Sequence, residues 1–316
     1  MKKAWIPAVI CMICLLLSGC AGAPANQQTA AEPLVDADAL QLTGDKETHS
    51  LYFRLGSSPY LAAEERSVTV APNDTLEAAL IRQLLAGPSA TQTALTPLFP
   101  KGTELIAVSR QGDLLFVTLN EAFLSGYTAE KSGLSSEKRA QAVQTERQLC
   151  LDALTATLTD AGVCTRVQLL IHRVKMQGNS LRLEEDYLYQ NGSSLPLDPS
   201  VRREESLYTP HNAAKYMLSL WMARDFDTLK GFVASAGRPG EQQLMDIMEN
   251  SPALTGFVLS GGQPSFDGQQ AIVTADISFY ENENAWTLKG YPFRLMRERG
   301  IWKISCDTLN NLMAGE

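Results

Sequence analysis

The spacing closest to a catalytic motif is a serine followed three positions later by a lysine. Ser135 and Lys138 have this spacing, which places a hydroxyl nucleophile near an amine base in some acyl-transfer enzymes. Those enzymes carry a Lys-Thr-Gly triplet far downstream of the serine, whereas the comparable triplet at 131–133 lies just upstream here. The motifs HExxH, GxSxG and GxxxxGK(S/T) do not occur. We therefore interpret Ser135 and Ser136 as residues that begin a helix.

The histidines and acidic residues do not form a metal-binding pattern. His49, His172 and His211 are the only histidines, and none has Asp, Glu or Cys at metal-ligand spacing as a motif. Glu184-Glu185-Asp186 is a single acidic run without the spaced carboxylates of a calcium loop, so we expect it to be solvated. The sequence thus predicts a non-enzyme with no catalytic residue, no metal and no cofactor.

A thiol near the N-terminus has a clearer chemical role. Two lysines precede the apolar residues 4–17, a stretch too short for an ordinary membrane span but typical of a signal peptide. The next residues are Leu17, Ser18, Gly19 and Cys20. They resemble a bacterial lipobox, which implies cleavage before Cys20 and transfer of a diacylglyceryl group to its thiol. An ordinary signal peptide with a chance cysteine is the alternative.

The remaining cysteines do not form a disulfide framework. Cys11 and Cys14 fall in the segment predicted to be removed, which leaves Cys150, Cys164 and Cys306. Fourteen helical residues would separate Cys150 from Cys164 by on the order of 20 Å, well beyond the ~7 Å limit for a disulfide. We expect buried free thiols.

The chain divides into five segments by composition. Its 27 Lys and Arg against 35 Asp and Glu give a formal net charge of −8, which disfavours nucleic acid as a partner. Polar and Pro-containing stretches predict a tether and a linker, and the tether spans roughly 30 Å as a flexible coil. We expect a lipoprotein signal peptide at 1–19, a flexible tether at 20–48, one domain at 49–189, a linker at 190–206 and a second domain at 207–316.

Apolar periodicity predicts an α+β first domain. We expect a helix that begins at Asp74 and ends at Gly87-Pro88, and a longer helix over 137–160 with one apolar side. The order is β-β-α-β-β-α-β, with helices on a mostly antiparallel sheet. The expected strands are 49–55, 66–70, a hairpin of 104–109 and 113–119, 163–171, and an edge strand at 181–189.

Short motifs recur along this domain in a defined order. They are Leu51-Tyr52-Phe53, Leu61, Glu65-Arg66-Ser67-Val68, Leu84-Leu85-Ala86-Gly87-Pro88, Phe99-Pro100-Lys101-Gly102-Thr103, Val117-Thr118-Leu119-Asn120-Glu121-Ala122-Phe123, and Ala156-Thr157-Leu158-Thr159 with Gly162-Val163. Together they resemble a GerMN domain over residues 49–180. The resemblance implies a small α+β module with assembly roles in sporulation or germination and without established catalytic residues. The stretch 126–136 departs from the pattern like an insertion.

The second domain has a helix-first order. We expect helices over 213–229 and 241–250, then strands at 255–259, 271–280, 285–297 and 300–306. This order and the closing run 297–304 (RERGIWKI) resemble an NTF2-like cone. The resemblance implies that the cone can enclose a ligand pocket.

Two functions follow from these patterns. One is an envelope lipoprotein held to the membrane by lipid on Cys20, at the extracytoplasmic face, that binds another envelope protein as an assembly module. We expect it to use a sheet edge at Leu51–Leu55 or Leu181–Tyr189. The other is a lipoprotein that binds a small ligand in the C-terminal NTF2-like pocket.

Overall fold

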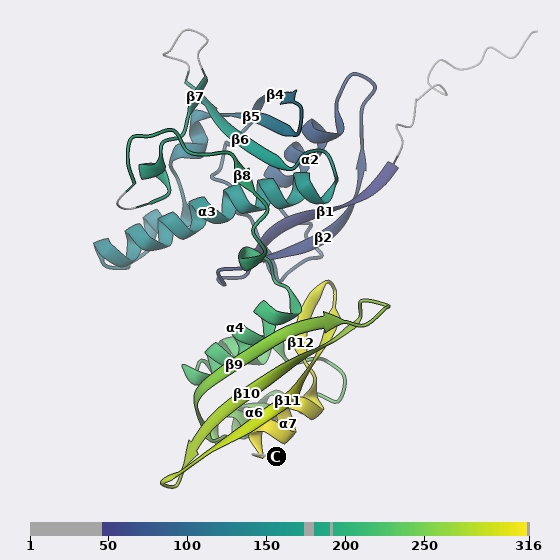
Figure 1. The fold of residues 1–316 in the computed structure, drawn as a ribbon, viewed down its shortest axis with the longest axis vertical. Helices are drawn as coiled ribbons and strands as arrows, with labels where there is room; N and C mark the ends of the chain where they lie inside the picture. Colours follow the sequence, from purple (N-terminus) through teal and green to yellow (C-terminus); the bar gives the residue numbers. More distant parts are fainter. Residues whose placement is uncertain (1–45, 174–179, 190–191, 315–316) are drawn as a thin grey trace, which may run out of the picture. The chain divides into compact units, whose positions relative to one another are not determined.

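A computed structural model describes residues 46–173, 180–189 and 192–314. Helices and mostly antiparallel sheets alternate along this part of the chain, which confirms the α+β class (Figure 1). Within it, no helix is both long enough and apolar enough to cross a membrane.

The first region contains two sheets rather than the single expected one. The smaller sheet has the order β2-β1-β3 and is antiparallel. Its register places Lys46 opposite Thr69 and Arg54 opposite Leu61. Its strands are β1 (Lys46–Leu55), β2 (Leu61–Thr69) and β3 (Leu95–Thr96).

The larger sheet has the order β4-β5-β6-β7, with β8 also paired to β6. The β4–β5 hairpin turns through two residues, and the first, Gly112, has φ +63°, a value that glycine adopts without strain. β5 and β6 are parallel, as a helical crossover between them requires. The strands are β4 (Leu105–Gln111), β5 (Leu114–Asn120), β6 (Arg166–His172), β7 (Ser180–Arg182) and β8 (Ser200–Val201).

Two helices lie between these sheets. α2 (Leu76–Leu85) contacts β1, β2 and β4, and α3 (Ser136–Asp160) contacts β1 and β6. The N-cap of α2 is Thr75, not Asp74 as expected, because the Thr75 hydroxyl accepts the N–H of Ala78 while Asp74 pairs with Arg82.

The expected apolar side of α3 is buried at Val143, Cys150, Leu154 and Leu158, but burial is not limited to that side. Every residue from 149 to 158 is buried, because a sheet covers the helix on each side. Single 3-10 turns complete this region: η3 (Glu121–Leu124), η4 (Thr128–Lys131), η5 (Glu185–Tyr187) and η6 (Glu204–Ser206).

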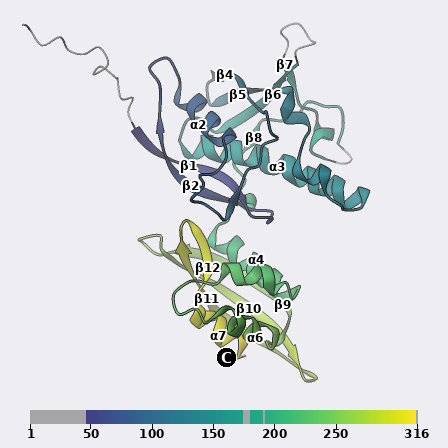
Figure 2. The ribbon, with the colours of Figure 1, turned by 180° about the vertical axis from the view of Figure 1, so that it is seen from behind.

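The second region packs helices on one face of a four-stranded antiparallel sheet with the order β12-β11-β10-β9 (Figure 2). Its elements are α4 (Pro210–Met222), α5 (Phe226–Leu229), η7 (Lys230–Phe232), α6 (Glu241–Glu249), β9 (Ala253–Pro264), β10 (Gln270–Glu281), β11 (Asn284–Glu298), β12 (Ile301–Ile304) and α7 (Cys306–Met313). The closing helix α7 was not expected from the sequence.

Buried side chains fill the helix-facing side of this sheet. Alternate residues of β10, from Ala271 through Ile277 to Phe279, are almost fully buried. Trp221 of α4 packs against Phe279 with ring centroids 5.7 Å apart. The three cysteines of the described chain, Cys150, Cys164 and Cys306, are free and buried, as expected.

Candidate functional site

The predicted lipidation residues Leu17, Ser18, Gly19 and Cys20 lie outside the described residues. The other residues considered for chemistry are within them but are not brought together. Ser135 is the N-cap residue of α3, and both Ser135 and Lys138 are exposed. His211 Nδ1 lies 3.2 Å from the Ser260 carbonyl oxygen, a structural contact. Among the residues that the structure describes, His, Cys, Asp and Glu form no cluster that could hold a metal.

The first edge expected to bind a partner, Leu51–Leu55, is not an edge. β1 pairs with β2 along its length and with β3 at Arg54 and Leu55. Beyond the short strand β3, a side chain of α3 bonds this side of β1: Thr157 Oγ1 accepts the N–H of Tyr52 at 3.2 Å. This expectation is therefore wrong, and the N–H that a partner strand would need is already bonded.

The second expected edge, Leu181–Tyr189, is an edge only at its start. β7 (Ser180–Arg182) is an outer strand of the larger sheet and pairs with β6, and the chain after it pairs with its own continuation. Leu197 N–H donates to the Leu183 carbonyl at 2.7 Å, and Glu185 N–H donates to the Leu195 carbonyl at 3.0 Å. The polar stretch between 190 and 206 thus supplies bonds that a partner would otherwise make.

β4 is the longer of the two outer strands of the larger sheet, since β7 has only three residues. β4 pairs with β5 on one side, and no other strand of the described chain pairs with its outer side (Figure 1). Ile106 occupies a bulge between Leu105 and Ala107, and its side chain is 47% exposed. An unpaired strand with an exposed apolar side chain can accept a strand from another chain.

Two contacts hold β4 at its ends. Arg110 donates to the Glu77 carboxylate of α2 at 2.5 Å. Asn120 Oδ1 accepts the N–H of Glu104 at 3.2 Å. Residues that flank a two-residue hairpin loop exchange hydrogen bonds, and bonded pairs then alternate with non-bonded ones. By this alternation the N–H groups of Val108 and Arg110 point away from β5, toward the open side.

A buried ion pair fixes the insertion-like stretch that departs from the sequence motifs. Glu146 is 7% exposed, and its carboxylate accepts from Arg54 Nη1 at 3.3 Å and from Ala129 N–H at 3.0 Å. Sequence reasoning missed this pair. The signal was present, because Glu146 falls on the expected apolar side of α3, three residues after Val143 and four before Cys150.

The buried Tyr127 and the partly buried Tyr187 extend this polar network. Their hydroxyl oxygens lie 2.7 Å apart, and the Phe123 carbonyl oxygen lies 2.8 Å from the Tyr127 hydroxyl and 3.1 Å from the Tyr187 hydroxyl, so one hydroxyl can donate to the other while that one donates to the carbonyl. Arg147 lies over the Tyr187 ring, 4.3 Å from its centroid. Burial raises the pKa of both tyrosines, so their hydroxyls stay protonated and serve as donors. The network is internally bonded and has a structural role.

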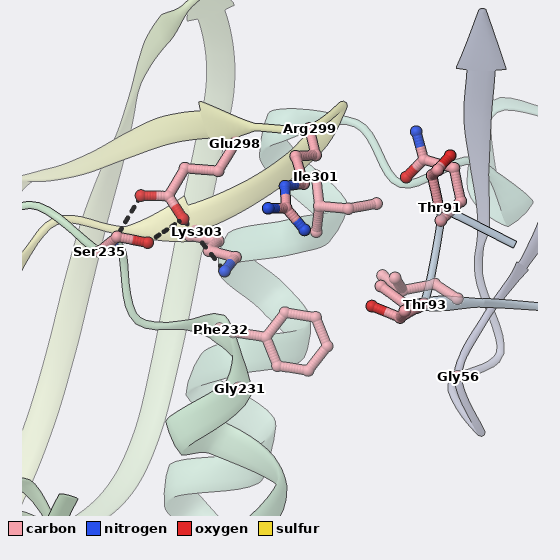
Figure 3. A pocket seen from close by; sticks show the side chains of 13 residues that line it. Gly56, Thr91, Thr93, Gly231, Phe232, Ser235, Glu298, Arg299, Ile301 and Lys303 are labelled. Atoms are coloured by element: carbon pink, nitrogen blue, oxygen red, sulfur yellow. Dashed lines mark hydrogen bonds and ion pairs between the residues drawn. The ribbon is translucent and has the colours of Figure 1, made fainter.

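A cavity of about 510 Å³ is lined by both regions of the chain (Figure 3). Arg299 and Phe232 lie on one side, opposite Thr91 and Thr93. Its volume is within the range of small-molecule sites. It lies beside the β11–β12 hairpin, whereas the sequence analysis expected a ligand pocket within the second region alone. The complete lining is Leu55, Gly56, Thr91, Gln92, Thr93, Ala94, Gly231, Phe232, Ser235, Glu298, Arg299, Ile301 and Lys303.

One carboxylate of this cavity is strongly bonded. Glu298 accepts the Ser235 N–H at 2.6 Å, the Ser235 hydroxyl at 2.9 Å and Lys303 Nζ at 3.1 Å. Burial alone would raise the pKa of Glu298, but these donors outweigh burial and lower it. Glu298 is therefore ionised at neutral pH and neutralises Lys303.

Comparison with known proteins assigns the first region. A family model named Germane, described as sporulation and spore germination, matches residues 50–172. Residues 50–172 are a GerMN domain. The GerMN domain relates the chain to proteins of sporulation and germination, and it contains both β4 and the Arg54–Glu146 pair.

Solved structures similar to the chain include the tandem GerMN domains of the sporulation protein GerM from Bacillus subtilis. The tandem GerMN structure and this chain are 13% identical in sequence. The match covers 76% of this chain and 63% of the tandem structure, with a TM-score of 0.34. The chain thus spans less than two thirds of the length of the tandem structure. The first GerMN domain of GerM, solved alone, is 14% identical to this chain. The match covers 50% of this chain and 98% of that domain, with a TM-score of 0.30.

A candidate lipoprotein from Clostridium perfringens is also similar. It is 22% identical, with 51% of this chain and 89% of that one covered and a TM-score of 0.29. No curated protein matches the chain.

Proposed function

We propose that this protein is a lipid-anchored, non-catalytic envelope protein whose GerMN domain binds a protein partner along β4. The observation that carries the proposal is the outer side of β4, from Leu105 to Gln111, with which no other described strand pairs and which is longer than the outer strand β7 of the same sheet. A partner strand added there would continue the larger sheet.

The anchor follows from the sequence around Cys20. A thiol at this position, after an apolar stretch too short to span the membrane, is the group that receives lipid in a lipobox. Two or more acyl chains give stable attachment, whereas one is marginal. Anchoring would hold the GerMN domain at the extracytoplasmic face, where sporulation and germination proteins of the envelope are candidate partners.

The acidic balance of the chain supports a protein partner over nucleic acid. The formal net charge is −8, and exposed cations of the GerMN domain such as Arg110 and Arg166 are already paired with Glu77 and Asp113. A polyanion would gain few free cations there. Backbone pairing along β4 needs no cationic surface.

The test places a photo-crosslinking side chain at Ile106 in cells. Tyr280 of β10 is the control, because it is 48% exposed, as Ile106 is 47% exposed, but it lies outside the GerMN domain. We expect a defined crosslinked species from position 106 and not from position 280. Equal crosslinking at the two positions would contradict the proposal.

Two proline variants separate binding from folding. Val108→Pro removes an N–H that points to the open side, so the fold should persist and the crosslink at Ile106 should be lost. Ser109→Pro removes an N–H that bonds β5, so it should destabilise the domain. If Val108→Pro keeps both its thermal midpoint and the crosslink, β4 is not the binding edge.

A further inference from the structure

The cavity beside the β11–β12 hairpin combines one charged surface with an apolar one. Phe232, Leu55 and Ile301 supply apolar lining, and Phe232 is held by Tyr216, whose ring centroid is 5.4 Å away. The charged side chains in the lining are Glu298, Arg299 and Lys303. Because Lys303 pairs with Glu298 at 3.1 Å, the cavity carries a net charge of about +1, contributed by Arg299.

Arg299 occupies a backbone position that disfavours it. The two-residue loop between Glu298 and Ile301 has φ +51° at Arg299 and φ +83° at Gly300. Both values are left-handed, as in a type I′ turn, where Asn and Gly are the favoured residues. A long side chain at the first position costs stability, so the hairpin alone does not account for arginine there.

The Arg299 guanidinium also lacks an ion pair within the described residues, although it lies beside the cavity (Figure 3). A guanidinium presents parallel N–H donors that match a carboxylate. A single unpaired cation suits a monoanion better than a doubly charged phosphate. The apolar lining next to it suits a hydrocarbon or aromatic group.

We propose that this cavity binds a small monoanionic carboxylate that carries an apolar group, with Arg299 as the residue that recognises the carboxylate. The proposal is independent of partner binding along β4, because the cavity shares no residue with that strand. A binding role of the β11–β12 hairpin would explain why arginine occupies position 299, where φ is left-handed.

The test titrates purified full-length protein, in neutral detergent, with phenylacetate, its uncharged isostere phenylacetamide and inorganic phosphate, by isothermal titration calorimetry. We expect phenylacetate to bind at least tenfold more tightly than phenylacetamide and than phosphate, because only it satisfies both the guanidinium and the apolar lining. Absence of saturable phenylacetate binding, or tighter binding of phosphate, would overturn the proposal.

Two glycine variants provide the matched comparison. Arg299→Gly relieves a left-handed φ and should keep or raise the thermal midpoint while removing the preference for phenylacetate. Glu283→Gly relieves a similar φ of +67° in the β10–β11 hairpin and should leave binding unchanged. Asparagine also adopts a left-handed φ readily, so Arg299→Asn is a second variant that shows whether an effect of Arg299→Gly comes from glycine itself. Undiminished binding by both Arg299 variants, or an equal loss in Glu283→Gly, would refute the assignment.

Discussion

Replacement of Glu146 by alanine tests what holds the insertion-like stretch to the GerMN domain. The change removes the carboxylate that accepts from Arg54 and from the Ala129 N–H. Arg54 would remain as a largely buried cation, with 20% of its side chain exposed, and the Ala129 N–H would lose its partner. Removal of one member of a buried ion pair costs about 3–5 kcal/mol, because it leaves an uncompensated charge.

The structure places Glu146→Ala at the lower end of that range. Arg54 also donates to the carbonyls of Ser57 at 2.8 Å and Ser58 at 2.9 Å, so part of its charge stays solvated by main-chain dipoles. We expect a loss of about 3 kcal/mol in the free energy of unfolding. At roughly 2–4 °C per kcal/mol, the thermal midpoint should fall by about 6–12 °C, measured by circular dichroism.

A double variant distinguishes an unpaired charge from lost packing. Arg54→Met with Glu146→Leu replaces both charges by apolar groups, a change that is often neutral for buried pairs. We expect it to recover part of the lost stability, because it removes the uncompensated charge while the Ala129 N–H still lacks its acceptor. Hydrogen exchange at 127–131 should be fast in Glu146→Ala, because the bond to Ala129 is lost. A double variant as unstable as the single one, or a single variant that loses less than 1 kcal/mol, would refute the reasoning.

Four further outcomes are expected. A hydrogen bond from Arg166 lowers the Asp113 pKa from 3.8 to about 2, so its contribution to stability is complete above pH 4 and is lost as the pH falls through 2; urea unfolding of Asp113→Asn should show a flatter pH dependence there. Glu283→Gly should raise the free energy of unfolding by about 0.5–1 kcal/mol, measured by urea titration, because strain relief exceeds the entropy cost of glycine. Cys20→Ala should lose labelling by a fatty-acid analogue and accumulate precursor; equal labelling would remove the anchor. Limited proteolysis should cut first within 190–206 and leave fragments that keep their circular dichroism.

The elements best predicted from the sequence are those with purely local signals. The β4–β5 hairpin follows from alternating apolar residues on either side of Gly112, and all four strands of the second region follow from similar alternation. α6 begins at Glu241 as expected, since its apolar residues recur at helical spacing. In each case neighbouring residues determine the conformation, and distant parts of the chain do not compete.

The N-cap of α2, the helix α7 and the cavity at Arg299 were not predicted, each for a different reason. Asp74 and Thr75 are both good N-cap residues, and the competing pairing of Asp74 with Arg82 decides for Thr75. The closing helix α7 had a usable signal in Ser305, whose hydroxyl accepts the Thr308 N–H at 3.2 Å. The cavity at Arg299 could not be predicted, because its lining comes from residues more than 200 positions apart.

The expectation that Leu51–Leu55 is a free edge was wrong for a reason that lies in α3. Helical periodicity in the sequence indicates a helix with one apolar side. α3 is instead buried on all sides between 149 and 158, and its buried residues there include Thr155 and Thr157. Thr157 is in this core because its hydroxyl accepts the Tyr52 N–H and so completes the open side of β1. A helix side chain thus bonds the open side of β1, whereas β4 pairs with β5 alone among the described strands. Which edge stays open is therefore decided by side chains of a helix about 100 residues away, beyond any local pattern in the strand itself.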